Sequence, residues 1–226
     1  LVHEDDSPKL IVVCVPPQLT AQIVAEELIA FPDAIVTDVA SVKAGILKEL
    51  ERLAAPTDRY VGSHPMAGRE RGGAIAGRAD LFVGRPWVIT PNSKSSPAGI
   101  KIVAELAQAL EASVITVSPK DHDRAVALVS HVPQLVSSLL AARLVDANQA
   151  DVNLAGQGLR DTTRIAASDP ELWVQILQAN STEVKSVLES LAVDLGNVID
   201  ALADVDSEAG IAQLRKALKD GNAGVE

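Results

Sequence analysis

The segment Lys9-Leu10-Ile11-Val12-Val13-Cys14-Val15 decides how this 226-residue chain folds. It is apolar on both faces and rich in β-branched residues, which predicts a strand buried on both sides. Pro16-Pro17 ends that strand, because proline has no backbone N–H to donate to a neighbouring strand. The apolar residues of Leu19–Phe31 then recur at helical spacing. A buried strand followed directly by a helix is typical of a parallel α/β sheet.

The same alternation of strands and helices continues to about residue 118. We predict strands at Ala34–Thr37, Arg59–Val61, Trp87–Thr90 and Ser113–Val117, and helices at Val42–Leu53 and Pro97–Leu110. Ser41 is the expected N-cap of the first of these helices. Strands that alternate with helices join through crossovers and lie parallel. The first part of the chain is therefore predicted to be α/β, with a doubly wound parallel, Rossmann-like sheet.

After Ser118-Pro119 the apolar periodicity is helical only. Helices are predicted at His122–Leu144, Pro170–Leu177, Thr182–Leu202 and Ile211–Leu218. We therefore divide the chain into an α/β domain at residues 1–118 and an all-helical domain at residues 119–226. The helical part carries more Ala, Leu and Val than it can bury alone, so we expect a homodimer through this domain.

Composition argues against several classes of partner. A net charge of −10 disfavours nucleic acid, whose phosphates need clustered Lys and Arg, and an anionic membrane surface. We find no signal peptide and no apolar segment long enough to cross a bilayer, so we expect a soluble cytoplasmic protein. Cys14 is the single cysteine, and inside the first strand it is expected to be buried and inert.

Gly62-Ser63-His64-Pro65-Met66-Ala67-Gly68 is the first candidate functional segment. His64 follows a predicted strand end, and ligands of open α/β sheets bind outside the carboxyl ends of the strands. A catalytic imidazole is one interpretation, and a turn histidine that only caps backbone groups is the other. Ser41, after the second strand, could orient His64 or contact a cofactor amide, although an N-cap role also explains it fully.

The helical part holds further candidates. His122 begins a helix, where a solvated capping segment is the simpler interpretation. His131 precedes Pro133, which kinks a helix and frees a carbonyl, so His131 either lines a cavity or is a satisfied interior residue. Arg164 could bind a substrate carboxylate through two hydrogen bonds, or pair with Asp161. No histidine has Cys, Asp or Glu at a metal-ligand spacing, so we predict no metal site.

Taken in order along the chain, these segments resemble the prephenate/arogenate dehydrogenase family of tyrosine biosynthesis. The resemblance covers roughly residues 9–200. The matching segments are Val13–Pro17, Asp38–Lys43, Ser63–Gly68, His122-Asp123, Ser130–Pro133, Arg160–Ala166, Ser168–Pro170 and Trp173. The resemblance implies a nucleotide-binding domain followed by a helical dimerisation domain, in agreement with the division at residue 118.

By this resemblance the reaction is the oxidative decarboxylation of prephenate to 4-hydroxyphenylpyruvate with NAD or NADP, or the corresponding reaction of arogenate. A hydride leaves the ring carbon that bears the hydroxyl, and carbon dioxide departs as the ring becomes aromatic. His64 is then the catalytic histidine that accepts a hydrogen bond from the hydroxyl, and Ser41 holds His64 or the nicotinamide amide. This role needs a neutral imidazole, so activity is expected to fall below a pH of about 6.5.

The resemblance also implies ligand contacts. Cofactor contacts are implied at Val15, Pro16, Pro17, Asp38, Ser41 and Pro65, and substrate contacts at Arg164, His131, Gln134, Arg69, Glu70 and Trp173. Gln134 stands where some members have a second histidine, near the substrate side chain. Because an amide both donates and accepts, Gln134 leaves prephenate and arogenate open. Arg69 departs from the small hydroxyl residue common in relatives, and with Glu70 it is expected at the pocket mouth.

No Gly-x-Gly-x-x-Gly follows any predicted strand, and the first strand resembles a later strand of the family's sheet. We therefore expect the opening strand, the phosphate-binding loop and the residue that selects NAD or NADP to lie before Leu1, and dinucleotide binding to be poor without them. Two alternatives stay open. A 3-hydroxyacid dehydrogenase of the 6-phosphogluconate type would need a lysine that the helix after Lys120 does not offer. A non-catalytic dimerisation or ligand-sensing module would not need His64, Ser41 and Arg164 together.

Overall fold

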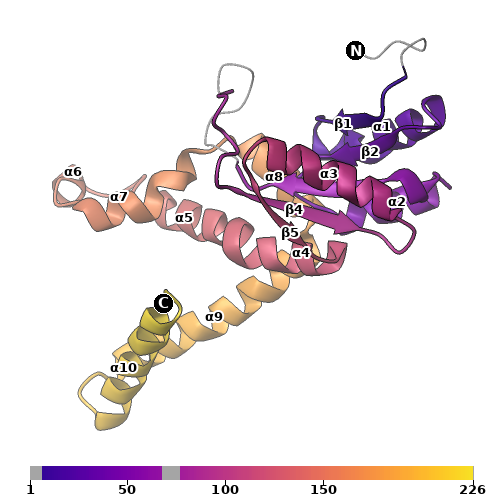
Figure 1. Ribbon diagram of the computed structural model, residues 1–226. Helices are drawn as coiled ribbons and strands as arrows, with labels where there is room; N and C mark the ends of the chain where they lie inside the picture. The colour runs from indigo at the N-terminus through magenta and orange to yellow at the C-terminus, as the bar shows by residue number, and fades with distance from the viewer. Residues whose placement is uncertain (1–6, 68–76, 226) are drawn as a thin grey trace. The chain divides into compact units, whose positions relative to one another are not determined.

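The computed structural model describes residues 7–67 and 77–225 (Figure 1). Arg69 and Glu70, at which substrate contacts are implied, lie outside the described residues. The chain divides into two compact units, one that ends at Ser181 and one that begins at Thr182. These units do not follow the change from α/β to helical sequence at residue 118, so the domain boundary at that residue stays a prediction.

The described strands are β1 (Leu10–Val13), β2 (Ile35–Asp38), β3 (Val61–Pro65), β4 (Pro86–Pro91) and β5 (Ser113–Thr116). β1 pairs parallel with β2, and a parallel bridge between Val36 and Tyr60 joins this pair to the row β3-β4-β5. The strands therefore follow one another across the sheet in chain order. β4 runs antiparallel to β3 and parallel to β5.

The antiparallel pairing of β3 with β4 corrects the predicted all-parallel sheet. Parallel neighbours need a crossover connection of a dozen or more residues, usually through a helix on one face. The described part of the connection from β3 to β4, residues 77–85, contains turns and no helix. The chain therefore re-enters the sheet from the end at which it left. The Rossmann-like α/β class is confirmed, with a mixed sheet.

Helices cover both faces of this sheet (Figure 1). α1 (Pro17–Ala30) and α2 (Ala44–Arg52) share a buried apolar cluster with β1 and β2, and α3 (Pro97–Ala109) packs in a second cluster with β3 and β4. Successive side chains of a strand point to opposite faces, so Val36 belongs to the first cluster and Ile35 packs against the second. Helices on both faces give the doubly wound arrangement that the alternating sequence pattern predicts.

The remainder of the first unit is helical. A short 3₁₀ turn, η1 (Thr57–Arg59), precedes β3, and the elements after β5 are α4 (Pro119–Val126), the π-helical turn η3 (Ala127–His131), α5 (Val132–Ala142), α6 (Gln149–Val152), α7 (Gln157–Thr163), the 3₁₀ turn η4 (Arg164–Ala167) and α8 (Pro170–Ala179). Ser118 and Asp169 cap α4 and α8 through their side chains. The sequence predicts a kinked helix before Pro133, and the structure has a π-helical turn there, which is a common way to absorb an irregular turn within a helix.

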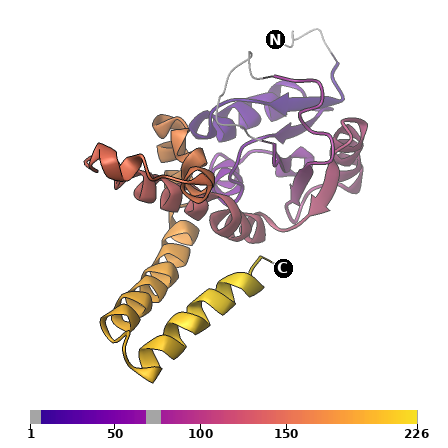
Figure 2. The same cartoon turned by 90° about the vertical axis from the view of Figure 1, so that its left-hand side faces the viewer.

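The second unit is a helical hairpin of α9 (Ser181–Ala203) and α10 (Glu208–Ala223), which Figure 2 shows as two neighbouring helices joined by a short turn. Ser207 caps α10, and Gln213 Nε2 donates a hydrogen bond of 3.1 Å to the carbonyl of Asn197 on α9. Large apolar side chains nevertheless remain exposed, among them Leu191, Val193, Leu195, Ile199, Leu202, Val205, Ile211 and Leu218. The hairpin by itself therefore leaves an apolar surface in contact with water.

Two expectations from the sequence are wrong. Cys14 is exposed instead of buried, because β1 ends at Val13 and does not continue to Val15.

One helical segment, Pro119–Ala142, is long and apolar enough to cross a membrane by length and composition, with a mean hydropathy of 1.6, although none was expected. Core helices of globular proteins meet the same criterion, so this is weak evidence for a membrane span.

Candidate active site

His64 lies inside β3, opposite Val88 of β4, and not in the loop that the sequence predicts. The strand continues past the predicted end at Val61, because His64 and Pro65 still pair with β4. Side chains alternate along a strand, so Ser63 turns into the core, where it is fully buried, while His64 turns to the other face and is partly exposed. The imidazole is therefore held by a paired strand and remains open to a ligand.

A line of hydrogen bonds joins His64 to α4. His64 Nδ1 lies 2.9 Å from His122 Nε2, and His122 Nδ1 lies 2.7 Å from Asp123 Oδ1. The two imidazole rings meet edge to face, with centroids 5.1 Å apart. His122 is only 1% exposed and Asp123 only 4%. His122 is therefore not a solvated capping residue, as the sequence suggests, but the inner partner of His64.

Asp123 also caps α2. Its Oδ1 accepts the backbone N–H of Lys43 at 2.9 Å, and its Oδ2 accepts that of Ala44 at 2.8 Å. A carboxylate at a helix N-terminus satisfies free N–H groups and meets the positive end of the helix dipole. Ser41, the predicted N-cap, does not cap this helix. The capping residue lies 80 positions away along the chain, where no local sequence pattern reveals it.

A buried ion pair lies next to His64. Lys43 Nζ donates to Asp38 Oδ1 and, at 2.7 Å, to the carbonyl of Ser63. Asp38 also accepts from Tyr60 Oη at 2.7 Å and from a backbone N–H two residues further on. Burial lowers the pKa of Lys43 and the charge of Asp38 opposes that shift, while burial and then Asp38 raise the pKa of Tyr60. The Asp38 carboxylate is fully enclosed by these partners, and the cofactor contact implied at Asp38 stays a prediction.

The surroundings of His64 favour its neutral form. Burial lowers the pKa of His64 well below its usual value of 6.5, and the positive charge of Lys43 lowers it further, followed by His122 and His131. An imidazole with a depressed pKa carries no charge at neutral pH. His64 can therefore accept a hydrogen bond or a proton from a ligand hydroxyl across the physiological range.

His131, at the end of η3, belongs to the same cluster. Asn180 Nδ2 donates to the carbonyl of Asp123 at 2.8 Å and lies 3.1 Å from His131 Nδ1. The rings of Trp173 and His131 meet edge to face, with their centroids 6.1 Å apart. Burial lowers the pKa of His131 to about 4, although Asp123 opposes the shift. The structure thus brings His64, His131 and Trp173 together, as implied. Asn180 is not among the predicted site residues, because an Asn at a helix C-terminus carries no functional signal of its own.

Gln134 lies on α5 and Arg164 on η4, two elements that are in contact. Gln134 is buried one turn after His131, and its Nε2 donates a hydrogen bond of 3.0 Å to the carbonyl of Ile165. This bond holds η4 against α5. Arg164 is the first residue of η4 and is exposed. Arg164 therefore lies on a segment that packs against α5, the helix that directly follows His131.

Most of the residues at which cofactor contacts are implied lie at the carboxyl edge of the sheet. Val15, Pro16 and Pro17 connect β1 to α1, and Ser41 and Pro65 are partly exposed. The hydroxyl of Ser41 makes no hydrogen bond to any described residue, which leaves it for a ligand amide. The turn before α1 does not suit a phosphate, because its two prolines have no N–H. These residues therefore fit the nicotinamide end of a dinucleotide, and not its pyrophosphate.

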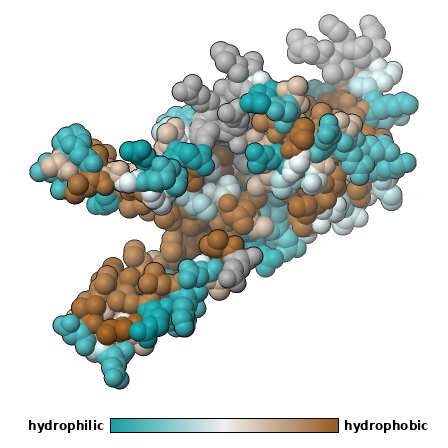
Figure 3. Space-filling model, turned by 60° about the vertical axis from the view of Figure 1, so that its left-hand side comes forward, coloured by the Kyte–Doolittle hydropathy of each residue, from teal (hydrophilic) through white to brown (hydrophobic). Residues whose placement is uncertain are grey.

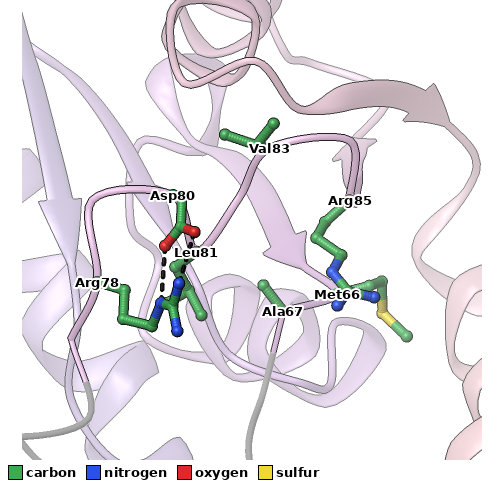
Figure 4. Close-up of a pocket in the computed structure, with 7 residues that line it drawn as sticks. All are labelled: Met66, Ala67, Arg78, Asp80, Leu81, Val83 and Arg85. Atoms are coloured by element: carbon green, nitrogen blue, oxygen red, sulfur yellow. Dashed lines mark hydrogen bonds and ion pairs between the residues drawn. The ribbon is translucent and has the colours of Figure 1, made fainter.

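A cavity of about 540 Å³ opens two residues after His64 (Figure 4). It is lined by Met66, Ala67, Arg78, Asp80, Leu81, Val83 and Arg85. Arg78 binds Asp80 through two hydrogen bonds of 2.8 and 2.7 Å, and Figure 4 shows the Arg85 side chain beside Met66. The sequence analysis singled out neither arginine, because isolated basic residues in a turn carry no pattern.

Known proteins match this chain over almost its whole length. Residues 3–116 match the profile of the prephenate dehydrogenase nucleotide-binding domain, and residues 118–220 match that of the prephenate dehydrogenase dimerization domain. A probable prephenate dehydrogenase of Streptomyces niveus is 34% identical over 206 residues, which cover 90% of this chain and 57% of that protein. The cyclohexadienyl dehydrogenase of Zymomonas mobilis is 29% identical, over 93% of this chain and 73% of that protein. The chain thus spans little more than half the length of the Streptomyces relative.

Solved structures agree with these matches. The prephenate dehydrogenase from Aquifex aeolicus, solved in complex with hydroxyphenyl propionate and NAD+, superposes with a TM-score of 0.84 at 28% identity, over 99% of this chain and 78% of that one. The Synechocystis arogenate dehydrogenase superposes with a TM-score of 0.77 at 29% identity, over 95% of this chain and 78% of that one.

Proposed function

Because this chain belongs to the prephenate dehydrogenase family, we propose that it catalyses the NAD-dependent oxidative decarboxylation of prephenate to 4-hydroxyphenylpyruvate in tyrosine biosynthesis. The observation that carries this proposal is the partly exposed His64, held on β3 and hydrogen-bonded to His122. NAD is proposed as the cofactor because the Aquifex relative was solved with NAD+.

His64 acts as the base in this reaction. Its Nδ1 is bonded to His122, so Nε2 is the nitrogen that faces the substrate. The substrate hydroxyl donates to Nε2, and its proton passes there as the hydride leaves the same ring carbon. Val15, Ser41 and Pro65 would hold the nicotinamide, which would supply the acceptor for that hydride. The resulting dienone loses its ring carboxylate as carbon dioxide, the bond electrons complete the aromatic ring, and the phenolate oxygen takes the proton back from His64.

The acid side of the pH profile of kcat/KM is expected to lie clearly below pH 6.5. His64 must be neutral to accept the hydroxyl proton, and its pKa is depressed by burial and by Lys43. The neutral form therefore persists as the pH falls through 6.5, and activity is lost only as the pH approaches the lower pKa of the folded protein. Initial rates measured between about pH 4.5 and 8 test this. A fall centred at 6.5 or above, as for an ordinary histidine, would contradict it.

Replacing Arg164 by alanine is expected to raise KM for the substrate about 10- to 100-fold and to change kcat little, because a hydrogen bond to a charged group contributes about 1.5–3 kcal/mol. Arg164 is an exposed guanidinium next to Ile165, which is tied to Gln134. The matched control is Arg143→Ala, which removes another exposed arginine, at the end of α5. An unchanged KM in Arg164→Ala, or an equal rise in the control, would remove Arg164 from the substrate site.

Arogenate is a second candidate substrate, and one observation favours it. Gln134 Nε2 is engaged with the carbonyl of Ile165, so the remaining polar atom of this amide is an acceptor, Oε1. An acceptor suits the ammonium group of arogenate better than the keto group of prephenate. The Synechocystis relative is an arogenate dehydrogenase, and the Zymomonas relative is a cyclohexadienyl dehydrogenase.

Nicotinamide reduction by the purified protein tests the proposed function. Prephenate and arogenate are each supplied with NAD and with NADP, and absorbance of the reduced nicotinamide is followed. Turnover with prephenate and NAD supports the proposal, and faster turnover with arogenate makes that compound the substrate. Absence of turnover with all four pairings, in protein that is folded and that binds the dinucleotide in a separate titration, would favour a non-catalytic dimerisation or ligand-sensing module.

We propose further that a second copy of this chain covers the exposed apolar side chains of α9 and α10. Figure 3 shows apolar side chains gathered over this hairpin, and residues 118–220 match a dimerization domain. Exposed apolar surface of this extent favours association, because burial stabilises by about 25 cal/mol per Å². Sedimentation equilibrium is expected to give twice the chain mass of 23.6 kDa. A monomer at micromolar concentration would contradict this proposal.

A further inference from the structure

The hydrogen bonds from His64 through His122 to Asp123 form one continuous line through buried space. His64 comes from β3, whereas the other two residues are neighbours on α4. The two links measure 2.9 and 2.7 Å. His122 is 1% exposed, so its ring nitrogens bond to protein groups and not to bulk water. The direction in which each link donates is therefore decided inside the protein.

The contacts of Asp123 determine which atom donates in the bond between His122 and Asp123. Both of its oxygens accept backbone N–H groups at the start of α2, from Lys43 and Ala44. A carboxylate held by donors is an acceptor toward its third partner as well, so His122 Nδ1 must be the donor in the bond to Asp123. In the neutral form of His122, which carries a single ring proton, that proton is therefore on Nδ1. His122 Nε2 is then a lone pair that can only accept.

The position of the proton on the His64 ring is determined by His122. Since His122 Nε2 accepts, His64 Nδ1 must donate to it, and the single proton of the neutral His64 ring is on Nδ1. The free nitrogen, Nε2, then holds a lone pair. Without His122, the two tautomers of His64 would both be populated, and in one of them Nε2 carries a proton and cannot act as a base.

We propose that His122 is a positioning residue, which through its bond to Asp123 holds His64 in the tautomer with the proton on Nδ1 and the lone pair on Nε2. The inference rests on the proposed function only for its kinetic consequence. The tautomer itself is a property of the protein without ligands. His122 never touches the reacting atoms and acts only through His64.

Asp123 is a poor position for the test, because it also caps α2, and its replacement would disturb the helix that follows Ser41. The test therefore uses His122→Phe and His122→Gln. Phenylalanine keeps a ring and removes both nitrogens. Glutamine carries a donor and an acceptor about as far apart as the ring nitrogens, so its amide N–H can donate to Asp123 while its oxygen accepts from His64.

The first readout is the ¹⁵N chemical shifts of the His64 ring in the full protein without ligands. We expect a protonated Nδ1 and an unprotonated Nε2 in the wild type and in His122→Gln, and a substantial Nε2-protonated population in His122→Phe. Ser118→Ala is the matched control, because it removes the N-cap of α4 and leaves the line of hydrogen bonds intact. It is expected to keep the wild-type tautomer.

The second readout is steady-state kinetics with the substrate and cofactor that the wild type uses. His122→Phe is expected to lower kcat about 10- to 1,000-fold with KM nearly unchanged, because a misplaced tautomer removes the base and not the binding site. His122→Gln is expected to recover most of the loss. An unchanged His64 tautomer in His122→Phe, or a loss in His122→Gln equal to that in His122→Phe, would overturn the proposal. If the wild type turns over no substrate, the proposed function fails and the tautomer measurement still decides the role of His122.

Discussion

Replacing His64 by asparagine is expected to lower kcat by about 10²- to 10⁴-fold, the range that a positioned general base contributes. Asparagine can place its amide N–H near the old Nδ1 position and so continue to donate to His122. It has no atom at the position of Nε2, where the substrate hydroxyl needs an acceptor. The substitution therefore removes the base and leaves the buried line of hydrogen bonds largely in place. Steady-state kinetics with the substrate and cofactor that the wild type uses measure the loss.

The control for His64→Asn is a measurement of thermal unfolding, which shows whether the variant is folded. His64 is partly exposed on a strand that stays paired with β4 through its backbone, so the thermal unfolding midpoint is expected to change little. A large fall of kcat with a preserved unfolding transition identifies His64 as the base. Retention of most of the turnover by a folded His64→Asn protein would mean that another group accepts the hydroxyl proton.

Replacing Lys43 by methionine is expected to destabilise the protein by about 3–5 kcal/mol, because removal of one partner from a buried ion pair leaves the other charge uncompensated. Lys43 is 1% exposed, and its Nζ contacts both Asp38 and the carbonyl of Ser63. Methionine fills a similar volume, so the cost comes from the unpaired carboxylate and not from a cavity. Urea unfolding followed by circular dichroism measures the change in the free energy of unfolding.

Two further variants make the test of Lys43 specific. Lys48→Met removes an exposed lysine from α2, the helix that Lys43 precedes, and is expected to stay within about 0.5 kcal/mol of the wild type. The double variant Asp38→Asn with Lys43→Met removes both charges and is expected to recover part of the lost stability. Equal stability of Lys43→Met and Lys48→Met would show that the buried pair does not hold this part of the fold together.

The sequence by itself determined the class of the fold, because the signals for it are local. The apolar run that ends at Pro16-Pro17 became β1, and the helical spacing after it became α1. The helix predicted to begin at Pro170 became α8. The order of short motifs was also enough to indicate the family, since each motif occupies a few consecutive residues.

Strand direction and exposure were not local properties. The antiparallel pairing of β4 depends on the path of the connection between Pro65 and Pro86, which no periodicity describes. Cys14 is exposed because β1 ends one residue before it. The sequence placed His64 close to its true position but in a loop, because the pairing that extends β3 comes from a partner strand more than twenty residues away.

Only the tertiary structure decided how the site works. His64 meets His122 across 58 residues of sequence, and Asp123 caps a helix that begins 79 residues before it. The sequence does not reveal that the carboxylate of Asp38 is enclosed and paired with Lys43. A local pattern records which side chains can donate, accept or carry charge. Which of them meet, and which way each hydrogen bond points, depends on atoms that only folding brings within 3 Å of one another.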